Sequence, residues 1–438
     1  MSLIISIVGR PNTGKSTLFN SLTESNRSMT DDFSGITRDT IYGTVDLDNG
    51  CFTLVDTGGL MLKEKDTESL NFKVNQLVLF AIDESDAVIF LTDRKVGFHP
   101  DDQEILRQLR KIGKRIFFCV NKVDDDAHMS VAAEFYESGE SDLMFISSSH
   151  KKGLGELKER ISEELSGKLS NETDDSHDLA LSIIGRPNAG KSTLVNRLLG
   201  EDKQLTHDMA GTTRESVDNF FKFHGKSIKI TDTAGIRRKA RVKDKIEKLS
   251  VLTAIRSVSR AEVVILMLDA TEYAVDQDLK LAAYVKQQGK PMIIAVNKWD
   301  VLEKDSMTHG KLKIEILDKF SFANYCPVVF ISALNGQRVH EMVKLALSLK
   351  EKRNFVVSQA RLIKFLKQIT EEHNLPLVRG RKNQVTYGIQ VKSSPPVFVF
   401  RAKYPDDIPA SHTRYVERRL REKFDLSGIP IKIVWEAK

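Results

Sequence analysis

The stretch GRPNTGKST at residues 9–17 recurs as GRPNAGKST at residues 185–193, so that the two copies lie 176 residues apart. Three further motifs repeat at the same offset and in the same order: the threonines of GITRD and GTTRE (Thr37 and Thr213), the first aspartates of DTGG and DTAG (Asp56 and Asp232), and the asparagines of NKVD and NKWD (Asn121 and Asn297). One phosphate-loop pattern arises easily by chance, but two ordered sets in one register do not. Each copy is long enough for a whole domain, and the sequence therefore predicts two nucleotide-binding domains in tandem.

Both nonapeptides match the phosphate-loop pattern GxxxxGK[ST] in full, between an apolar run and an amphipathic helical stretch. Glycines let backbone N–H groups curl around a phosphate, and the N-terminus of the following helix favours negative charge. We expect Lys15 and Lys191 to place a cation on the β- and γ-phosphates, and the hydroxyls of Ser16 and Ser192 to bind Mg²⁺. The same context in both copies disfavours the alternative, a glycine turn that merely starts a helix.

Two later motifs of each copy predict the switch segments of a nucleotide hydrolase. Thr37 and Thr213 lie in Gly/Asp-rich stretches, where a loop can close a threonine over Mg²⁺ and the γ-phosphate and release it after hydrolysis. DTGG and DTAG each follow an apolar strand, which places Asp56 and Asp232 at strand ends facing the Mg²⁺ site through water. The backbone N–H of Gly59 or Gly235 can then meet the γ-phosphate.

The motifs NKVD and NKWD predict which base is bound. A carboxylate at Asp124 or Asp300 accepts hydrogen bonds from both N1–H and the exocyclic amine of guanine, a donor pair that adenine lacks, and an unpaired buried carboxylate is costly. The preceding asparagines are expected to brace the loop and touch the base. Ser332-Ala333-Leu334 can supply a backbone N–H to the guanine oxygen; its counterpart, Ser147-Ser148-Ser149, is a looser match whose contact residue the sequence leaves open.

One residue type is absent from both copies. The residue after the DxxG motif is Leu60 in the first copy and Ile236 in the second, where GTPases of the Ras type carry a water-orienting glutamine. An aliphatic side chain cannot orient water by hydrogen bonding. Each domain is therefore expected to hydrolyse slowly alone or to obtain help elsewhere.

The fold class expected is α/β, because apolar strand-like runs alternate with helical stretches in both copies. The domain boundaries predicted are residues 1–165 for the first nucleotide-binding domain and 179–350 for the second, with an acidic flexible linker at 166–178. From residue 351 the order of elements reads α-β-β-α-β, a small α+β domain with no phosphate loop and no catalytic constellation. Within the first copy, Asp48-Asn49-Gly50 predicts a hairpin turn.

Composition predicts a soluble globular chain of roughly three domains. No apolar run approaches the ~20 residues that a membrane helix requires, and the N-terminus leads directly into a strand without a signal peptide. Cys51, Cys119 and Cys326 lack the spacing of metal ligands and are expected to be buried, reduced thiols. These features favour a cytoplasmic protein without a membrane partner, which we expect to be a monomer.

Charge is unevenly placed along the chain. The segment from Glu351 onward carries 18 Lys and Arg against 9 Asp and Glu, a net charge of +9 within a total of +6, which leaves −3 for the rest. A basic tail on a mildly acidic body favours a polyanionic partner, although an ordinary soluble surface stays open as an alternative. Arg414, Arg418 and Arg421 are spaced to share one helix face. A second basic stretch, GIRRKARVKDKIEK after the second DxxG motif, is either an RNA-contacting switch segment or a solvated helix face.

Two Era-like GTPase domains followed by a basic α-β-β-α-β tail ending in SGIPIKIVWE resemble the bacterial Der (EngA) family, over nearly the whole chain. The resemblance implies a tail similar to a KH module and a role in assembly of the large (50S) ribosomal subunit through rRNA. The tail lacks the GxxG loop by which ordinary KH modules clamp nucleic acid. The resemblance also implies K⁺ near the β/γ-phosphate bridge, held by an asparagine of the phosphate loop. Asn12 and Asn188 occupy that position, and loop bracing is the alternative role for them.

These arguments define the predicted site residues. The predicted catalytic residues are Lys15, Thr37, Gly59, Lys191, Thr213 and Gly235. The predicted ligands are Ser16, Thr37, Asp56, Ser192, Thr213 and Asp232 for Mg²⁺ and Asn12 and Asn188 for K⁺. The predicted nucleotide-binding residues are Gly9, Arg10, Pro11, Asn12, Thr13, Gly14, Lys15, Ser16, Thr17, Asp56, Thr57, Gly58, Gly59, Asn121, Lys122 and Asp124 in the first copy, and Gly185, Arg186, Pro187, Asn188, Ala189, Gly190, Lys191, Ser192, Thr193, Asp232, Thr233, Ala234, Gly235, Asn297, Lys298, Asp300, Ser332 and Ala333 in the second.

The function predicted is GTP hydrolysis in ribosome assembly, with GTP or GDP in both domains setting how they pack against the tail. The alternative is a signalling or scaffold GTPase whose basic tail binds an acidic protein. A phosphate-loop ATPase or kinase is disfavoured by the paired NKxD motifs.

Overall fold

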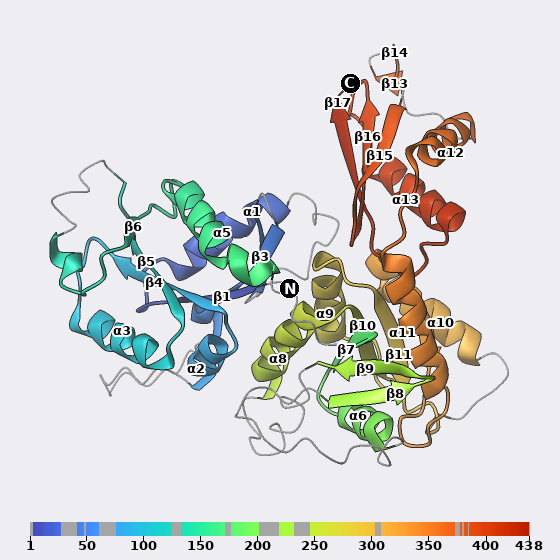
Figure 1. Ribbon diagram of the computed structural model, residues 1–438, viewed down its shortest axis with the longest axis horizontal. Coiled ribbons are helices and arrows are strands. Elements are labelled where there is room, and N and C mark those ends of the chain that lie inside the picture. Colours follow the sequence, from blue (N-terminus) through green and yellow to red (C-terminus); the bar gives the residue numbers. More distant parts are fainter. Residues whose placement is uncertain are drawn as a thin grey trace. The chain divides into compact units, whose positions relative to one another are not determined.

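The computed structural model describes residues 3–27, 42–47, 50–60, 76–124, 133–170, 177–200, 219–231, 246–302, 308–372, 377–378, 381–383 and 385–437. The chain divides into two compact units, Met1–Asp175 with Val242–Ser259, and Ser176–Arg241 with Arg260–Lys438. The division after Asp175 falls inside the predicted linker. The basic tail lies in the same unit as the second nucleotide-binding domain, and Figure 1 labels the elements of each.

A six-stranded sheet forms the centre of the first unit, in the order β2-β3-β1-β4-β5-β6. Its strands are β1 (Leu3–Val8), β2 (Tyr42–Leu47), β3 (Gly50–Asp56), β4 (Ala87–Asp93), β5 (Arg115–Asn121) and β6 (Leu143–Phe145). The β2–β3 pair is antiparallel, as the predicted hairpin requires, and every other pair is parallel. Asp48 and Asn49 of the predicted turn lie outside the described residues.

Helices cover both faces of this sheet. They are α1 (Lys15–Arg27), α2 (Gln76–Asp83), α3 (Pro100–Ile112), α5 (Leu154–Ser170), the 3₁₀ turn η1 (Thr57–Leu60), and α8 (Ile246–Arg260), which follows the second switch region. Alternate residues of β4 enter different cores: Ile89 packs with α1 and α5, whereas Phe90 packs with α2 and α3. Strands buried on both faces explain the nearly continuous apolar runs in the sequence.

The second unit repeats the same sheet, in the order β12-β11-β10-β7-β9-β8. Its strands are β7 (Leu179–Gly185), β8 (Asn219–Phe223), β9 (Lys226–Ile230), β10 (Val263–Asp269), β11 (Met292–Asn297) and β12 (Val328–Phe330). Its helices are α6 (Lys191–Gly200), α9 (Asp276–Gln287), α10 (Thr308–Lys319), α11 (Val339–Arg353) and the 3₁₀ turn η3 (Ser321–Ala323). The β8–β9 pair is antiparallel and the rest are parallel, so the prediction of two mostly parallel α/β domains is confirmed.

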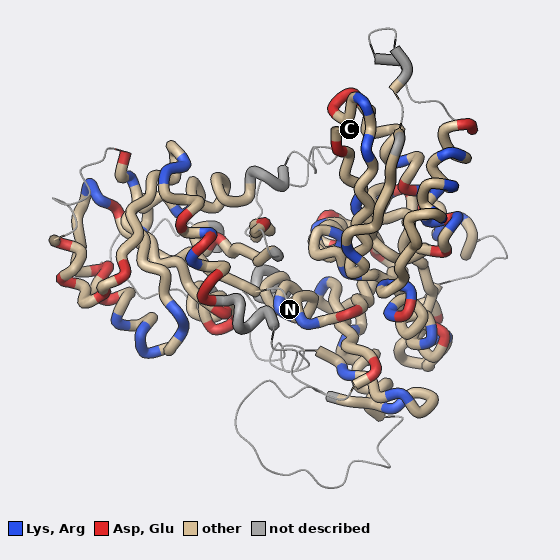
Figure 2. The backbone as a smooth tube through the Cα atoms, turned by 45° about the horizontal axis from the view of Figure 1, so that its top comes forward, with Lys and Arg blue, Asp and Glu red and all other residues tan. Residues whose placement is uncertain are grey.

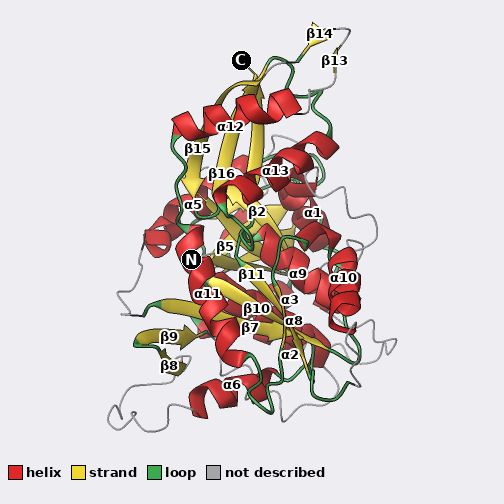
Figure 3. Cartoon of the chain, turned by 90° about the vertical axis from the view of Figure 1, so that its right-hand side faces the viewer, coloured by secondary structure: helices red, strands yellow, loops and turns green. Residues whose placement is uncertain are grey.

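The tail has the predicted order α-β-β-α-β, built from α12 (Gln359–Glu372), β15 (Val385–Ser393), β16 (Pro396–Ala402), α13 (Ala410–Phe424) and β17 (Lys432–Ala437). β15 and β16 are antiparallel, and β16 and β17 are parallel. A short antiparallel pair, β13 (Leu377–Val378) with β14 (Arg381–Lys382), was not predicted, because two-residue strands leave no periodicity in a sequence. Figure 3 shows the helices beside the three-stranded sheet.

The tail shares one hydrophobic core with the second nucleotide-binding domain. That core includes Ile183 of β7, Leu349 of α11, and Phe400 and Leu420 of the tail. At the junction the Arg421 guanidinium carbon lies 4.1 Å from the centre of the Tyr325 ring. Continuous apolar burial of this kind makes the two parts one folded unit.

Helix α5 ends later than the sequence analysis expected. It continues to Ser170, five residues into the predicted linker. Leu165 and Leu169 extend the helical spacing of Leu157 and Ile161, so that the helix period continues beyond residue 165. Residues 171–176 lie outside the described residues.

All three cysteines are free thiols, and Cys119 and Cys326 are buried, as predicted, whereas Cys51 is half-buried. Burial raises the pKa of Cys119 and raises that of Cys326 to about 12, so both remain protonated thiols. Among the described residues, we find no helix with the length and apolar character needed to cross a membrane.

Candidate nucleotide-binding sites

The two phosphate loops have the same backbone conformation. Each connects the end of a central strand, β1 or β7, to the first residue of a helix, Lys15 or Lys191. Asn12 and Asn188 adopt left-handed φ angles of 66° and 65°. Gly14 has φ 95°, and a Cβ at that position would collide with the Asn121 amide. Both loops therefore curl at the N-terminus of a helix, where backbone N–H groups are unsatisfied and favour an anion.

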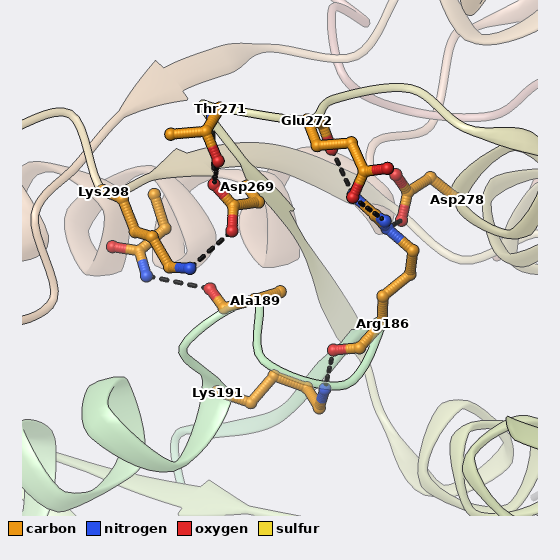
Figure 4. A network of polar contacts seen from close by, with 9 residues as sticks. Arg186, Ala189, Lys191, Asp269, Thr271, Glu272, Asp278 and Lys298 are labelled. Carbon is orange, nitrogen blue, oxygen red and sulfur yellow. Dashed lines mark hydrogen bonds and ion pairs between the residues drawn. The ribbon is translucent and has the colours of Figure 1, made fainter. Parts of the chain in front are cut away.

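The lysine of each loop folds back over that loop. Lys15 Nζ donates to the carbonyl oxygens of Gly9 at 2.9 Å and Arg10 at 2.6 Å. Lys191 Nζ donates to the equivalent carbonyls of Gly185, at 2.8 Å, and Arg186 (Figure 4). Burial lowers the pKa of Lys15 to about 8, against the opposing effect of the nearby carboxylates. A desolvated ammonium at the mouth of the loop is suited to receive phosphate oxygens.

The predicted Mg²⁺ ligands of the first site converge. Ser16 Oγ donates to Asp56 Oδ2 at 2.6 Å, and the Gly58 backbone N–H donates to Asp56 Oδ1 at 2.8 Å. Asp56 is the last residue of β3, as predicted, and is buried. Thr57 is occupied differently, because its hydroxyl donates to the Ile7 carbonyl at 2.6 Å and anchors the turn.

Several predicted residues of the switch regions lie outside the described residues. They are Thr37 in the first copy, Thr213, Asp232, Thr233, Ala234, Gly235 and Ile236 in the second, and the basic stretch from Arg237 to Lys245. Gly59 and Leu60 lie in η1, at the end of the first DxxG motif.

The asparagines of the base motifs connect the phosphate loop to the base loop in both copies. Asn121 Nδ2 donates to the Thr13 carbonyl at 2.8 Å, and Asn297 Nδ2 donates to the Ala189 carbonyl at 2.9 Å. Each Oδ1 accepts from a backbone N–H of the base loop, that of Ser148 at 3.0 Å or that of Ala333 at 2.8 Å. The predicted bracing role agrees with these contacts, and Ser148 is the structural counterpart of Ala333.

The carboxylates predicted to read guanine lie beside these loops. In the first copy Asp124 Oδ1 accepts from the Ser147 hydroxyl at 2.7 Å, and Lys152 Nζ donates to the Asp124 carbonyl, also at 2.7 Å. Asp124 is 44% exposed, and Asp300 is also exposed. Each carboxylate is therefore positioned at a pocket edge where the edge of a base can reach it.

Two pairs of acidic residues support the sites and were missed by the sequence analysis. Asp93 and Asp269 end β4 and β10, and each accepts from the lysine of the base motif, Lys122 or Lys298, at 2.5 Å. Their spacing of 176 residues is the signal that would have found them, since it is the offset of the phosphate loops. They fix the lysine stems beside the base loops.

The second pair receives the arginines of the phosphate loops. Arg10 Nε lies 2.8 Å from Asp102, and Arg186 Nε lies 3.2 Å from Asp278. Each aspartate also accepts from a backbone N–H at the start of its helix, α3 or α9. Burial raises the pKa of Asp278 to about 6 in spite of Arg186. The guanidinium groups thus tie the loops to these helices, a contact that the nucleotide-binding prediction for Arg10 and Arg186 did not include.

Comparison with known families identifies the domains. The family model described as a 50S ribosome-binding GTPase matches residues 4–122 and again residues 180–298. The model for the C-terminal KH-domain-like region of EngA bacterial GTPases matches residues 357–436. The model of the elongation factor Tu GTP-binding domain matches residues 251–352.

Similar proteins cover the chain from end to end. The GTPase Der of Geobacter metallireducens is 39% identical over 438 residues, which are 100% of this chain and 99% of that protein. The chain belongs to the GTPase Der (EngA) family. The GTPase Der of Fusobacterium nucleatum is 40% identical over 445 residues, covering 100% of this chain and 99% of its own length. Among solved structures, Era in complex with MgGDPNP and a fragment of 16S ribosomal RNA is 24% identical, covering 59% of this chain and 92% of Era, with a TM-score of 0.32.

Membership of the Der family confirms the resemblance inferred from the motifs. The protein is a GTPase: it binds GTP and GDP in two tandem domains and hydrolyses GTP, and it carries a KH-like domain at its C-terminal end.

Proposed function

We propose that this Der-family GTPase acts in assembly of the large (50S) ribosomal subunit, in the cytoplasm, with rRNA as its binding partner. The observation that carries the proposal is the continuous hydrophobic core that joins a basic KH-like domain to a GTPase domain. A GTP site and a basic domain in one folded unit suit a factor that attaches to RNA and is released by hydrolysis. The description of the matching family as ribosome-binding supports the proposal.

The basic helix α13 needs a correction as an RNA-binding face. Arg421 is only 12% exposed, since it packs on Tyr325 and pairs with Glu417. Arg419 pairs with Glu372 and Glu422, and Arg418 lies 3.8 Å from Glu422. The helical spacing placed the arginines correctly on one side but could not show what covers them. Acidic neighbours therefore offset most of the charge on which the sequence argument rested.

Exposed lysines on α12 are better candidates for contact with phosphate. Lys364 and Lys367 lie on the side of α12 opposite its buried residues Leu362, Phe365 and Ile369. Figure 2 shows the basic and acidic positions along the tail. Long, exposed ammonium side chains bind phosphates without reading sequence, so that affinity falls with salt.

Reversing the charge of these lysines should weaken binding to the large subunit. We expect Lys364→Glu with Lys367→Glu to reduce co-sedimentation with isolated 50S subunits and to lower the slope of log affinity against log salt by about 2, one for each lost phosphate contact. GTP binding should be unchanged. The matched control is Lys311→Glu with Lys313→Glu on α10, an equal change of charge in the same unit. If both double variants sediment like the parent protein, the RNA-binding surface is not on α12.

The alternative function, a signalling or scaffold GTPase with an acidic protein partner, is tested by the same sedimentation. Binding to 50S subunits or naked rRNA that changes between GDP and a non-hydrolysable GTP analogue favours ribosome assembly. Retention of an acidic protein with no nucleotide-dependent binding to the ribosome favours the alternative.

We propose that Mg²⁺ is the divalent cofactor of both sites. Ser16 and Asp56 already place a hydroxyl and a carboxylate together, the oxygen ligands that Mg²⁺ prefers, and Ser192 is the equivalent hydroxyl of the second site. When bound, the ion neutralises charge on the β- and γ-phosphate oxygens. The loop amides orient the phosphates, and the two lysines contribute the fixed positive charge.

Potassium is proposed as a second cation, because neither domain carries the water-orienting glutamine. Asn12 and Asn188 hold the same left-handed conformation, and both are exposed, so that the amide oxygen of each is accessible to a cation at the loop. A cation there would offset charge that develops between the β- and γ-phosphates, as an arginine does in other GTPases.

GTP turnover should be faster in KCl than in NaCl at equal ionic strength, by about tenfold or more, since fixed positive charge at developing negative charge has large effects. Asn188→Ala should remove that difference for the second domain, measured as phosphate release. Asn324→Ala, which changes another exposed asparagine of the same unit, serves as the control. Equal rates of the parent protein in the two salts would contradict the proposal.

A further inference from the structure

The two base loops of this GTPase have the same backbone but different side chains. Ser147 pairs with Lys152 in an isolated β-bridge, and Ser332 pairs with Gln337 in the same way. Since Ser148 and Ala333 also make the same contact with their asparagines, the next residues correspond to each other: Ser149 in the first loop and Leu334 in the second. A hydroxyl in one pocket thus stands where the other has an isobutyl group.

The Leu334 side chain is unusually exposed for its size, at 66%. It follows Ala333, whose N–H meets the Asn297 side chain at 2.8 Å. Trp299, the residue before Asp300, donates its backbone N–H to the Ile331 carbonyl at 3.1 Å. These two contacts place the rim that carries Leu334 beside the motif that reads guanine.

The second base loop is also held more firmly than the first. Arg197 of α6 donates from Nε to the Ala333 carbonyl at 2.8 Å and from Nη2 to the Leu334 carbonyl. At the equivalent position of the first copy, Ser21 makes one bond, from its hydroxyl to the Ser148 carbonyl at 2.7 Å. The backbone of Leu334 is therefore fixed while its side chain remains outside the core, an arrangement suited to receiving a ligand.

We propose that Leu334 is a further nucleotide-binding residue, whose side chain packs on a face of the guanine ring in the second site. The edge of guanine is polar and would meet Asp300, but the face of the ring is apolar, so covering it removes apolar surface of both partners from water. Ser149 cannot provide this contact in the first site. The second domain consequently retains its nucleotide longer than it would with a polar residue at this position.

The experiment loads one site at a time in the full-length chain. In an Asp124→Asn background, GDP with a fluorescent ribose label occupies the second site, and dissociation is followed after adding excess unlabelled GDP. Leu334→Ser should speed dissociation by about fivefold to tenfold, because most of the contact area of one leucine is lost. Val356→Ser is the matched control, since Val356 is 65% exposed in the same unit. Substitution of exposed residues of this kind leaves the fold intact.

Two further variants test the contact with the ring face. In an Asp300→Asn background, Leu334→Ser should speed dissociation of xanthosine diphosphate from the second site by a similar factor, because a contact with the face does not read the edge. In the first site, with Asp300→Asn present, Ser149→Leu should slow GDP dissociation. Unchanged dissociation in Leu334→Ser, or equal acceleration in Val356→Ser, overturns the proposal. Acceleration for GDP but not for the xanthine nucleotide also overturns it, since the effect would then act through Asp300.

Discussion

Replacing Asp300 with asparagine should transfer the second site from guanine to xanthine nucleotides and lower its affinity for GTP by about 10⁴-fold. Guanine presents two donors, N1–H and the exocyclic amine, which require an acceptor. The asparagine amide brings its own N–H₂ against them, whereas xanthine carries a carbonyl oxygen in place of the amine and can accept from it. Competition between labelled GTP and unlabelled XTP measures the change.

The two sites provide controls for each other in this test. Asp124→Asn should produce the same transfer in the first site only, and the double variant should prefer XTP in both. The Ser147 hydroxyl, which donates to Asp124 at 2.7 Å, can reorient toward an amide oxygen, so we expect no loss of folding. Asp318→Asn, at an exposed position of α10, should leave both specificities unchanged. A preference for GTP over XTP that persists in Asp300→Asn would show that other groups read the base.

The motif residues could be placed from the sequence because their geometry is local. A strand, a glycine-rich turn and a helix that begins at Lys15 or Lys191 follow from one continuous segment, and the offset of 176 residues carries every such inference from one copy to the other. The order of elements in the tail was also predictable, since its helices and longer strands have clear apolar periodicity.

Contacts between distant segments could not be predicted in this way. Arg10 and Asp102 are 92 residues apart in sequence, and neither residue type alone indicates a partner. The counterpart of Ala333 in the first copy was ambiguous among three serines until the Asn121 contact selected Ser148. Arg421 was placed on a basic face by its spacing, but packing on Tyr325 removes it from that surface. Tertiary packing decides each of these cases, and a single sequence does not encode it in a readable form.

Removing the lysine of each phosphate loop should separate the contributions of the two domains to GTP hydrolysis. Lys15→Ala or Lys191→Ala removes the cation that would lie on the β- and γ-phosphates, and we expect single-turnover hydrolysis in that domain to fall by about 10²- to 10³-fold. Each variant should retain the turnover of its other site, and the double variant should lose nearly all phosphate release.

The control for this loss is a lysine that makes a similar backbone contact far from phosphate in the sequence motifs. Lys114 Nζ donates to the Asp83 carbonyl at 2.9 Å, and burial lowers its pKa, as it does for Lys15. Lys114→Ala therefore removes a desolvated ammonium and leaves one carbonyl without its donor, but it should leave hydrolysis unchanged. If Lys114→Ala slows hydrolysis as much as Lys15→Ala does, the loss reflects a disturbed fold. If Lys15→Ala and Lys191→Ala each retain the full rate with GTP at saturation, the lysines act in binding alone, and the transition-state charge must be met by the loop amides and bound cations.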